Sequence, residues 1–482
     1  MPMSVISLTI TLVICYLLII KIVAYFAHRK SSQTVEDFFL DGRNTGLIAL
    51  IGTLLATRVN ALSFTSTPAF MYRGGILYSM VFVGTTASFF LLRYFGPRVW
   101  HTCKKNNFIT QAELFGHYYQ SPLLYLLTVI IGIFCVFPFL TVQFSAVAKV
   151  FSTATENAVT YEQSVFFLAL FTGVYIFFGG AKAVIWTDVV QGMCFASLSI
   201  ISACQFTHWA GGYGKGIETL TQAIPEKLVF NSKNTPIFFD LVLSWPFANL
   251  LWPQAFQRIM MARSSNTIRQ AALGRLGVSL CMIIVTLTMG IMATAALYGQ
   301  ISDSDKLITE MYVKYMPLGG AMIVLAVISS GMSTIDSILL TLSSIFTRDI
   351  IEKLLPKPLS EKLRYRFAQS ISVFTLVIAS SLALSEVGKG YLVNLVTLSA
   401  TFATFLLWPL LGMYVWKKST KIGVISAIII PFFAFCITNL IKNYWMLSIP
   451  LGSTTIAFLV GLFSFVVVSL LTRNLVEVVD RE

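Results

Sequence analysis

Long runs of apolar residues follow one another along most of the chain, and short polar connections separate them. Because a helix that crosses a bilayer needs about 20 mostly apolar residues, the pattern predicts about thirteen membrane-spanning helices. The connections leave no room for a sizeable soluble domain. We therefore predict an all-α membrane protein with helices at 4–27, 46–72, 75–97, 121–151, 162–180, 184–207, 237–261, 273–298, 317–346, 367–385, 391–415, 422–441 and 447–472.

Two of these runs contain polar residues and prolines that predict a break in the helix. The run 46–72 contains Asn60 and Pro68, and the run 237–261 contains Pro246 and Pro253. Proline removes a backbone donor, and carbonyls left without a partner are tolerated at membrane depth where they line a cavity. The two runs are five helices apart and so cross in opposite directions. Interrupted helices at matching positions of two inverted halves are typical of a transporter's binding site.

Composition and charge agree with this membrane assignment. Charged residues make up only 11% of the chain, against about 25% in an ordinary soluble domain. The net charge of +13 does not indicate nucleic-acid binding, because basic residues collect in the cytoplasmic loops of membrane proteins. The loop charges predict a multi-pass protein of the plasma (inner) membrane with the N-terminus outside and the C-terminus cytoplasmic. In this topology Arg258 and Arg275 belong to the inner boundary.

Few charged residues remain inside the predicted spans. Lys21 and Lys149 are expected to extend along the apolar surface toward a helix end, whereas Arg58 lies too deep for this explanation. The seven Cys show no CxxC or Cys/His spacing, so neither a disulfide framework nor a zinc site is indicated. The four His lie near loops or helix ends, which argues against an embedded enzyme. We expect no enzymatic activity and no cofactor besides a coupling ion.

The stretch 329–337 concentrates hydroxyl groups inside an apolar span. Ser330, Ser333, Thr334 and Ser337 recur at three- and four-residue spacing, so they share one helix face. Polar groups at membrane depth usually face a cavity, an ion or another helix. Hydroxyls and carbonyls are hard oxygen ligands that suit sodium. The alternative is that these side chains only pack small interfaces or bond to their own backbone.

Two further stretches carry polar residues. At 179–191, a glycine pair predicts a tight inner turn, and Asp188 follows within the next helix; a carboxylate there needs an ion or a partner, and a loop Lys or Arg is the alternative to an ion. At 245–258, the side chains of Trp245, Asn249 and Gln254 lie deep enough to contact a solute, while Arg258 is interpreted as a basic anchor at the inner helix end.

Three motifs together resemble the sodium:solute symporter family, which includes sodium/proline, sodium/glucose, sodium/sialic-acid and sodium/multivitamin transporters. They are Gly-Gly-x-x-Ala-Val-x-Trp-Thr-Asp-x-x-Gln at 179–191, Met-Ser-Thr-x-Asp-Ser at 332–337 and Gln-x-x-Gln-Arg at 254–258. The resemblance covers nearly the whole chain. It implies a LeuT-type fold in one transporter domain, 1–482, with a five-plus-five inverted repeat. The repeats would be 46–207 and 237–415, with one extra helix before them (4–27) and two after them (422–472).

The resemblance also implies where cations bind. A main sodium site would use the carbonyls of Ala56, Val59 and Ser330 and the hydroxyls of Ser333 and Thr334. Some relatives have a second sodium site, whose counterpart here would be formed by Asp188, Ser333, Asp336 and Ser337. Asp336 departs from the serine of that two-sodium pattern, so one sodium, two sodium ions or a proton all remain open.

Arg58 is the main departure from the family, which usually has an uncharged or acidic residue beside the break. One interpretation is a structural ion pair with Asp188 or Asp336. A second is that the planar guanidinium binds a substrate carboxylate with two hydrogen bonds, and a third is that its charge weakens or replaces sodium binding. The predicted solute contacts are Arg58, Asn60, Ser63, Trp245, Asn249 and Gln254.

We therefore predict a sodium-coupled secondary active symporter that imports a small organic solute by alternating access and works as a monomer. Arg58 favours a carboxylate-bearing solute. The alternatives are a symporter for a neutral sugar or amino acid, and a solute-sensing membrane receptor of the same fold with little transport. The predicted partners are sodium, the solute and the lipid bilayer, with no nucleic acid.

Overall fold

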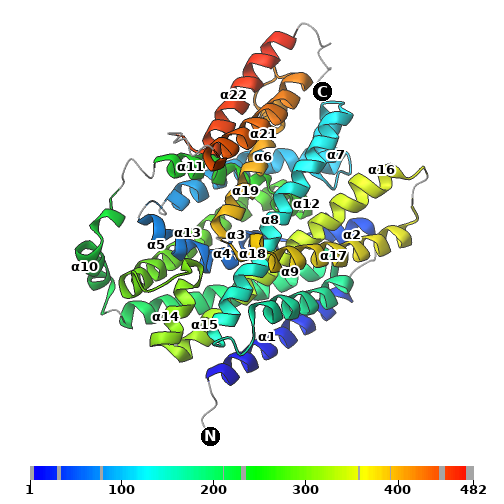
Figure 1. The fold of residues 1–482 in the computed structure, drawn as a ribbon. Coiled ribbons are helices and arrows are strands. Elements are labelled where there is room, and N and C mark those ends of the chain that lie inside the picture. Colours follow the sequence, from blue (N-terminus) through cyan, green and yellow to red (C-terminus); the bar gives the residue numbers. More distant parts are fainter. Residues whose placement is uncertain are drawn as a thin grey trace.

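The structure is a computed structural model, and it describes residues 5–29, 34–75, 77, 80–209, 211–229, 235–356, 359–390, 392–444 and 451–473. Within these ranges the chain forms helices and no β-strand, apart from one isolated bridge between Thr45 and Ala262 (Figure 1). The helices are α1 (Val5–His28), α2 (Val35–Leu40), η1 (Asp41–Arg43), α3 (Leu47–Arg58), α4 (Ala61–Phe64), α5 (Ser66–Gly74), α6 (Met80–Lys105), α7 (Gln111–Tyr118), α8 (Pro122–Ala154), α9 (Tyr161–Trp209), α10 (Tyr213–Ala223), η3 (Pro225–Lys227), α11 (Thr235–Leu251), α12 (Pro253–Met261), α13 (Ser265–Leu297), η5 (Ser304–Lys306), α14 (Leu307–Tyr315), α15 (Pro317–Ser344), η6 (Ile345–Ile351), α16 (Glu352–Leu354), α17 (Glu361–Leu384), α18 (Glu386–Lys389), α19 (Leu392–Phe405), α20 (Leu407–Tyr414), α21 (Lys421–Tyr444) and α22 (Ser453–Thr472).

Within the described residues, every apolar run predicted from the sequence coincides with one of these helices or with a group of them. Residues 4, 76, 78, 79, 391 and 447–450 of the predicted runs lie outside the described residues. Among the described residues, 9 helices are long and apolar enough to cross a membrane, and Leu47–Arg58 and Pro236–Leu251 are shorter apolar helices. The all-helical membrane fold is therefore confirmed. The count of thirteen and the inverted repeat stay predictions. Short helices such as α2, α7, α10 and α14 lie in connections, where the sequence pattern did not predict them.

Both predicted helix breaks are present in the structure. In the run 46–72, helix α3 ends at Arg58 and α4 starts at Ala61, with extended backbone at Val59 (φ −93°, ψ 112°) and Asn60 (φ −134°, ψ −178°). In the run 237–261, α11 ends at Leu251, Trp252 has a non-helical backbone (φ −54°, ψ 129°), and Pro253 begins α12. Proline suits this first helical position, because the N–H that it lacks has no partner there.

The start of α3 and the end of α12 are joined through their backbones. Thr45, just before α3, donates its N–H to the carbonyl of Met261 at 3.1 Å, and Arg263 donates its N–H to the carbonyl of Thr45 at 3.0 Å. The indole Nε1 of Trp100 also donates to the carbonyl of Ala262 at 2.7 Å. These bonds hold α3, α6 and α12 together at the end of the bundle that the loop charges assign to the cytoplasm.

Helix α15 lies at the centre of the bundle. Its apolar stretch within Gly319–Leu354 is 94% buried, the highest share among the candidate spans of the described chain. Helices α8, α9, α12 and α17 pack around it, and α1 lies along α9 and α15 (Figure 1). Helices α21 and α22 pack on each other at one edge of the molecule (Figure 1). The polar stretch 329–337 is consequently enclosed by protein rather than lipid.

Two of the sequence-based assignments of basic residues are wrong. Lys149 does not extend toward a helix end. It is 4% exposed, and its Nζ lies 3.1 Å from Asp303 and 3.0 Å from Asp305. Burial raises the pKa of Asp305, and the ammonium group of Lys149 opposes this shift. Arg275 is not in a loop, because α13 already begins at Ser265; its Nη2 donates to the hydroxyl of Ser88 at 2.7 Å.

Helix α9 contains the predicted glycine turn. Gly180 has φ 62° and ψ −173°, which divides α9 into two helices. A Cβ atom at this position would lie 2.8 Å from Cδ2 of Phe38 and 3.3 Å from its carbonyl oxygen. Both the left-handed backbone and the close approach of α2 therefore require glycine.

We expect Gly180→Ala to destabilise the protein, because a residue with a side chain in this conformation costs about 1–3 kcal/mol and the new methyl group meets Phe38. The measurement is thermal unfolding of the detergent-purified protein. The matched control is Gly192→Ala, where a Cβ has no neighbour within 4 Å. Equal unfolding temperatures for the two variants would contradict this account of the turn.

Candidate functional site

The break after α3 turns a backbone carbonyl toward the hydroxyl groups of α15. The hydroxyl of Thr334 donates to the carbonyl of Ala56 at 3.1 Å, and the hydroxyl of Ser333 lies 3.5 Å from the same oxygen. Both hydroxyls also lie within 3.1 Å of the carbonyl of Ser330. All four residues are fully buried. The structure thus gathers two carbonyl and two hydroxyl oxygens from α3 and α15.

The fifth residue predicted for this oxygen cluster lies at the break itself. Val59 caps α3, donates its N–H to the carbonyl of Leu55 at 2.8 Å, and is buried. Close packing of α15 supports the cluster, because a Cβ atom at Gly331 would lie 2.5 Å from Val147 and 3.3 Å from Cβ of Ala61. Glycine at 331 is what allows α15 to approach α4 and α8 this closely.

The oxygens of this cluster fit a sodium ion. All are neutral hydroxyl or carbonyl oxygens, which are hard ligands of the kind that alkali and alkaline-earth cations take. A hydroxyl keeps two lone pairs for a cation when its proton turns away. Within the described part of the chain, no group of three or more His, Cys, Asp or Glu forms a transition-metal site.

The start of α4 is held by side chains instead of by a preceding helical turn. Asn60 accepts a hydrogen bond from the N–H of Leu62 at 3.0 Å, and the hydroxyl of Ser63 accepts one from the N–H of Asn60 at 3.3 Å. The amide oxygen of Gln143, on α8, accepts the N–H of Ala61 at 3.2 Å. These bonds satisfy donors that the break would otherwise leave unpaired.

The residues predicted for a second cation contact a buried arginine. Arg258 is 0% exposed, its Nη2 lies 3.7 Å from Oδ2 of Asp188, and it donates to the hydroxyl of Ser337. Asp336 also interacts electrostatically with this guanidinium. Thr53 donates to Asp188 Oδ2 at 2.5 Å. The interpretation of Arg258 as a basic anchor at the inner boundary is wrong, because α12 is enclosed by α2, α3, α6 and α15.

A cavity of about 40 Å³ lies on the other side of the break. Four of the predicted solute contacts line it: Arg58, Asn60, Ser63 and Trp245. It has room for a few water molecules, so a solute would require its walls to move apart. Two predicted contacts do not line it. Asn249 bonds to the carbonyl of Trp245 at 2.8 Å, and Gln254 lies in α12 with its amide buried.

Sequence reasoning missed three aromatic residues that line this cavity, Phe70, Phe139 and Trp252. Trp252 and Phe139 both line it, with their rings stacked at 4.6 Å and 19°. Trp252 adjoins the Gln-x-x-Gln-Arg motif, so its position beside the break was a usable signal. Phe139 lies in an unremarkable apolar run of α8 and carried no such signal.

Arginines dominate the electrostatics beside the cavity. Arg58 donates to the hydroxyl of Thr85 at 2.8 Å and lies over the ring of Trp245 at 5.7 Å. Arg275 of α13 donates to the hydroxyl of Ser88, which lies about one turn after Thr85 on α6. No Asp or Glu lines the cavity within the described residues. Asp188 forms its ion pair with Arg258. The interpretation of Arg58 as the structural partner of Asp188 is therefore wrong.

We expect Arg258→Gln to be strongly destabilising, because removing one partner of a buried ion pair costs about 3–5 kcal/mol. Thermal unfolding in detergent measures this loss. The double variant Asp188→Asn with Arg258→Gln should recover part of it, since the carboxylate then loses its charge as well. Arg263→Gln is the control, because Arg263 is exposed. Similar unfolding temperatures for R258Q and R263Q would argue against the buried pair.

Comparison with known proteins places the chain among membrane transporters. Residues 38–431 match the model of the sodium:solute symporter family. The sodium/pantothenate symporter of Haemophilus influenzae is 27% identical over 466 residues, covering 93% of this chain and 94% of its own. The sodium/proline symporter of Escherichia coli is 21% identical, covering 88% and 86%.

A solved structure of a sodium-coupled sialic acid symporter superposes with a TM-score of 0.78 at 18% identity, covering 97% of this chain and 98% of that one. At this identity the likeness shows a common fold. The match of the family model extends over most of the sequence and includes both broken helices and the polar stretch of α15. The chain belongs to the sodium:solute symporter family.

Proposed function

We propose that this protein imports a small carboxylate-bearing solute together with one sodium ion by alternating access. The observation that carries the proposal is the break between α3 and α4. On one side of it, the carbonyl of Ala56 meets the hydroxyls of Ser333 and Thr334. On the other side, Arg58, Asn60 and Ser63 line a cavity. A cation and a solute bound to one short segment would stabilise the same local conformation, which is the basis of coupling.

The proposed sodium site uses Ala56, Val59, Ser330, Ser333 and Thr334. Membership of a family of sodium-coupled symporters supports sodium as the coupling ion. One sodium ion moving down a membrane potential of 100 mV supplies about 2.3 kcal/mol. We also propose, from the loop charges, that the N-terminus is outside, and that a monomer is the working unit.

Charge balance favours one sodium ion over two. With both carboxylates ionised, Asp188 and Asp336 carry two negative charges beside the single positive charge of Arg258. A sodium ion among the neighbouring neutral oxygens of Ser333 and Thr334 would bring the net charge of this group, Asp188, Asp336, Arg258 and the ion, to zero. A buried charge is expensive unless it is balanced, so a second sodium ion would leave an excess. In this proposal the guanidinium of Arg258 serves where some relatives bind a second cation.

An anionic solute is supported by the arginines. Arg58 lines the cavity and bonds to Thr85 of α6, and Arg275 of α13 bonds to Ser88, about one turn further along α6. The cavity wall has no described carboxylate. Pantothenate, proline and sialic acid, the solutes named for the similar proteins, all carry a carboxylate group. The stacked rings of Trp252 and Phe139 would contact apolar parts of the solute.

We expect Thr334→Val and Ser333→Ala to raise the sodium concentration for half-maximal uptake by about tenfold or more, because a bond between a hydroxyl and a charged group contributes about 1.5–3 kcal/mol. The measurement is sodium-driven uptake of labelled pantothenate, proline or sialic acid into proteoliposomes. Ser344→Ala is the control, since this hydroxyl bonds within its own helix at the far end of α15. Counting labelled sodium per solute in the same vesicles should give a ratio near one; a ratio of two would refute the charge-balance proposal.

We expect Arg58→Gln to weaken uptake of the transported carboxylate by about tenfold or more, because the neutral amide loses a charge-assisted hydrogen bond. For pantothenate the matched probe is pantothenol, in which an alcohol replaces the carboxylate: the wild type should prefer the acid, and R58Q should not. The control is Arg93→Gln, because Arg93 is exposed on α6.

The outcome also separates the remaining alternatives. Unchanged carboxylate affinity in R58Q would sink the anion-binding role. Gradient-driven uptake of only neutral sugars or amino acids would indicate the neutral-solute symporter. Solute-dependent thermal stabilisation without gradient-driven uptake would indicate a sensor, because ligands that bind the folded state raise its stability whether or not they are transported.

A further inference from the structure

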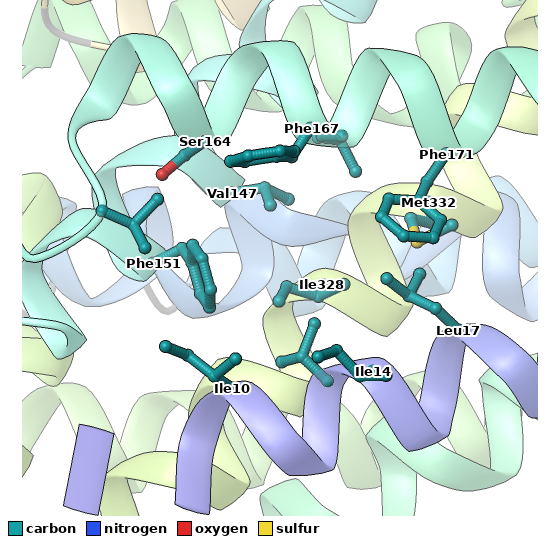
Figure 2. A pocket seen from close by; sticks show the side chains of 13 residues that line it. Ile10, Ile14, Leu17, Val147, Phe151, Ser164, Phe167, Phe171, Ile328 and Met332 are labelled. Atoms are coloured by element: carbon teal, nitrogen blue, oxygen red, sulfur yellow. The ribbon is translucent and has the colours of Figure 1, made fainter. Parts of the chain in front are cut away.

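A second cavity, remote from the solute cavity, lies between α1, α8, α9 and α15 (Figure 2). It has a volume of about 270 Å³, and its lining is apolar except for Ser164. Figure 2 shows Phe167 and Phe171 of α9 opposite Ile14 and Leu17 of α1, with Ile328 and Met332 of α15 between them. The proposed mechanism makes no use of this space.

The cavity continues along α1 toward Lys21. An adjoining cavity of about 210 Å³ shares Leu17, Phe171 and Met332 with the first and extends to Lys21 and Val174. Together they form one groove, which we call the α1 groove. From Ile10 to Lys21 the groove follows α1 for about 16 Å, at 1.5 Å per helical residue.

The groove opens toward the bilayer and has a floor inside the protein. Ile14, Phe167 and Phe171 at its rim are exposed to nearly half their surface. Val147, Ile328 and Met332 at its floor are buried. Because α1, α8 and α15 are apolar enough to span the membrane, the open side faces lipid rather than water.

We propose that the α1 groove binds one acyl chain of an anionic phospholipid, with the lipid phosphate held by Lys21. The apolar lining matches the hydrocarbon chain. Lys21 is exposed at the end of the groove and makes no ion pair with any described residue. A cation at the end of an apolar channel complements an anionic headgroup, and lysine acts as a point charge toward phosphate.

The size of the groove argues against a protein occupant. A helix with its side chains is about 10–12 Å across, so a helical segment as long as the groove would need more room than the two cavities of about 270 Å³ and 210 Å³ provide together. An acyl chain has no such bulk. The occupant also contacts Met332, the residue directly before Ser333, so the lipid would pack against the helix that carries the proposed sodium ligands.

The test measures phospholipid retained by the delipidated, detergent-purified protein after incubation with phosphatidylglycerol, read by native mass spectrometry. Leu17→Trp, which fills the groove where its two cavities meet, and Ile14→Trp, which fills it from the exposed rim, should each lower retention at least fivefold. Leu18→Trp is the matched control, since Leu18 is on the same helix, is 55% exposed and does not line the groove. Equal retention in the two filling variants and in L18W would overturn the proposal.

The headgroup contact is tested with a second pair of variants. Lys21→Gln should lower retention of phosphatidylglycerol at least fivefold and abolish its preference over diacylglycerol, which lacks the phosphate. Lys421→Gln, at the exposed start of α21, should behave as the wild type. Retention unaffected by K21Q would overturn the proposal, and so would a dimer of this chain that L17W dissociates. The assay contains no sodium gradient and no solute, so its result does not depend on the proposed symport.

Discussion

A backbone group inside a bilayer must find a partner within the protein, since the hydrocarbon offers none. The interruption between α3 and α4 breaks this rule locally, and much of the surrounding structure restores it. The carbonyl of Ala56 accepts a hydrogen bond from the hydroxyl of Thr334 on α15, and the N–H of Ala61 donates one to the amide oxygen of Gln143 on α8. Asn60 and Ser63 cap the new helix. A cation could bind among these oxygens if the hydroxyl protons of Ser333 and Thr334 turned away from the carbonyl of Ala56.

Buried charge is divided between the two sides of this interruption. On one side, the carboxylates of Asp188 (α9) and Asp336 (α15) interact with the guanidinium of Arg258 (α12). On the other side, Arg58 and Arg275 bond to hydroxyls of α6. In the proposed function, one side would accept a cation and the other an anion, and the two ligands would partly neutralise each other across a single stretch of extended chain. Under that proposal, sodium and solute would stabilise each other electrostatically without direct contact.

Much of this architecture was readable from the sequence, because the bilayer imposes a strong pattern. The apolar runs predicted the helices, and Asn60 and Pro253 were among the residues that predicted the two interruptions. The hydroxyl spacing in α15, and the family resemblance it carries, predicted which residues would meet Ala56. The errors concern single charged side chains. Arg258, Arg275 and Lys149 appear in the sequence as ordinary boundary residues, and only tertiary packing reveals that α12 is enclosed, that α13 starts early and that a loop folds over α8.

The bond between Gln143 and Ala61 has a mechanical consequence. In a continuous helix, the N–H of residue 61 would be tied to the turn before it, and bending there would break backbone bonds. Here that tie runs sideways to a neighbouring helix through one amide. A tilt of one segment relative to the other would therefore leave the hydrogen bonds within each helix intact. The resistance to such a tilt would depend in part on one side chain, so a substitution at Gln143 could change it without changing the sequence of α3 or α4.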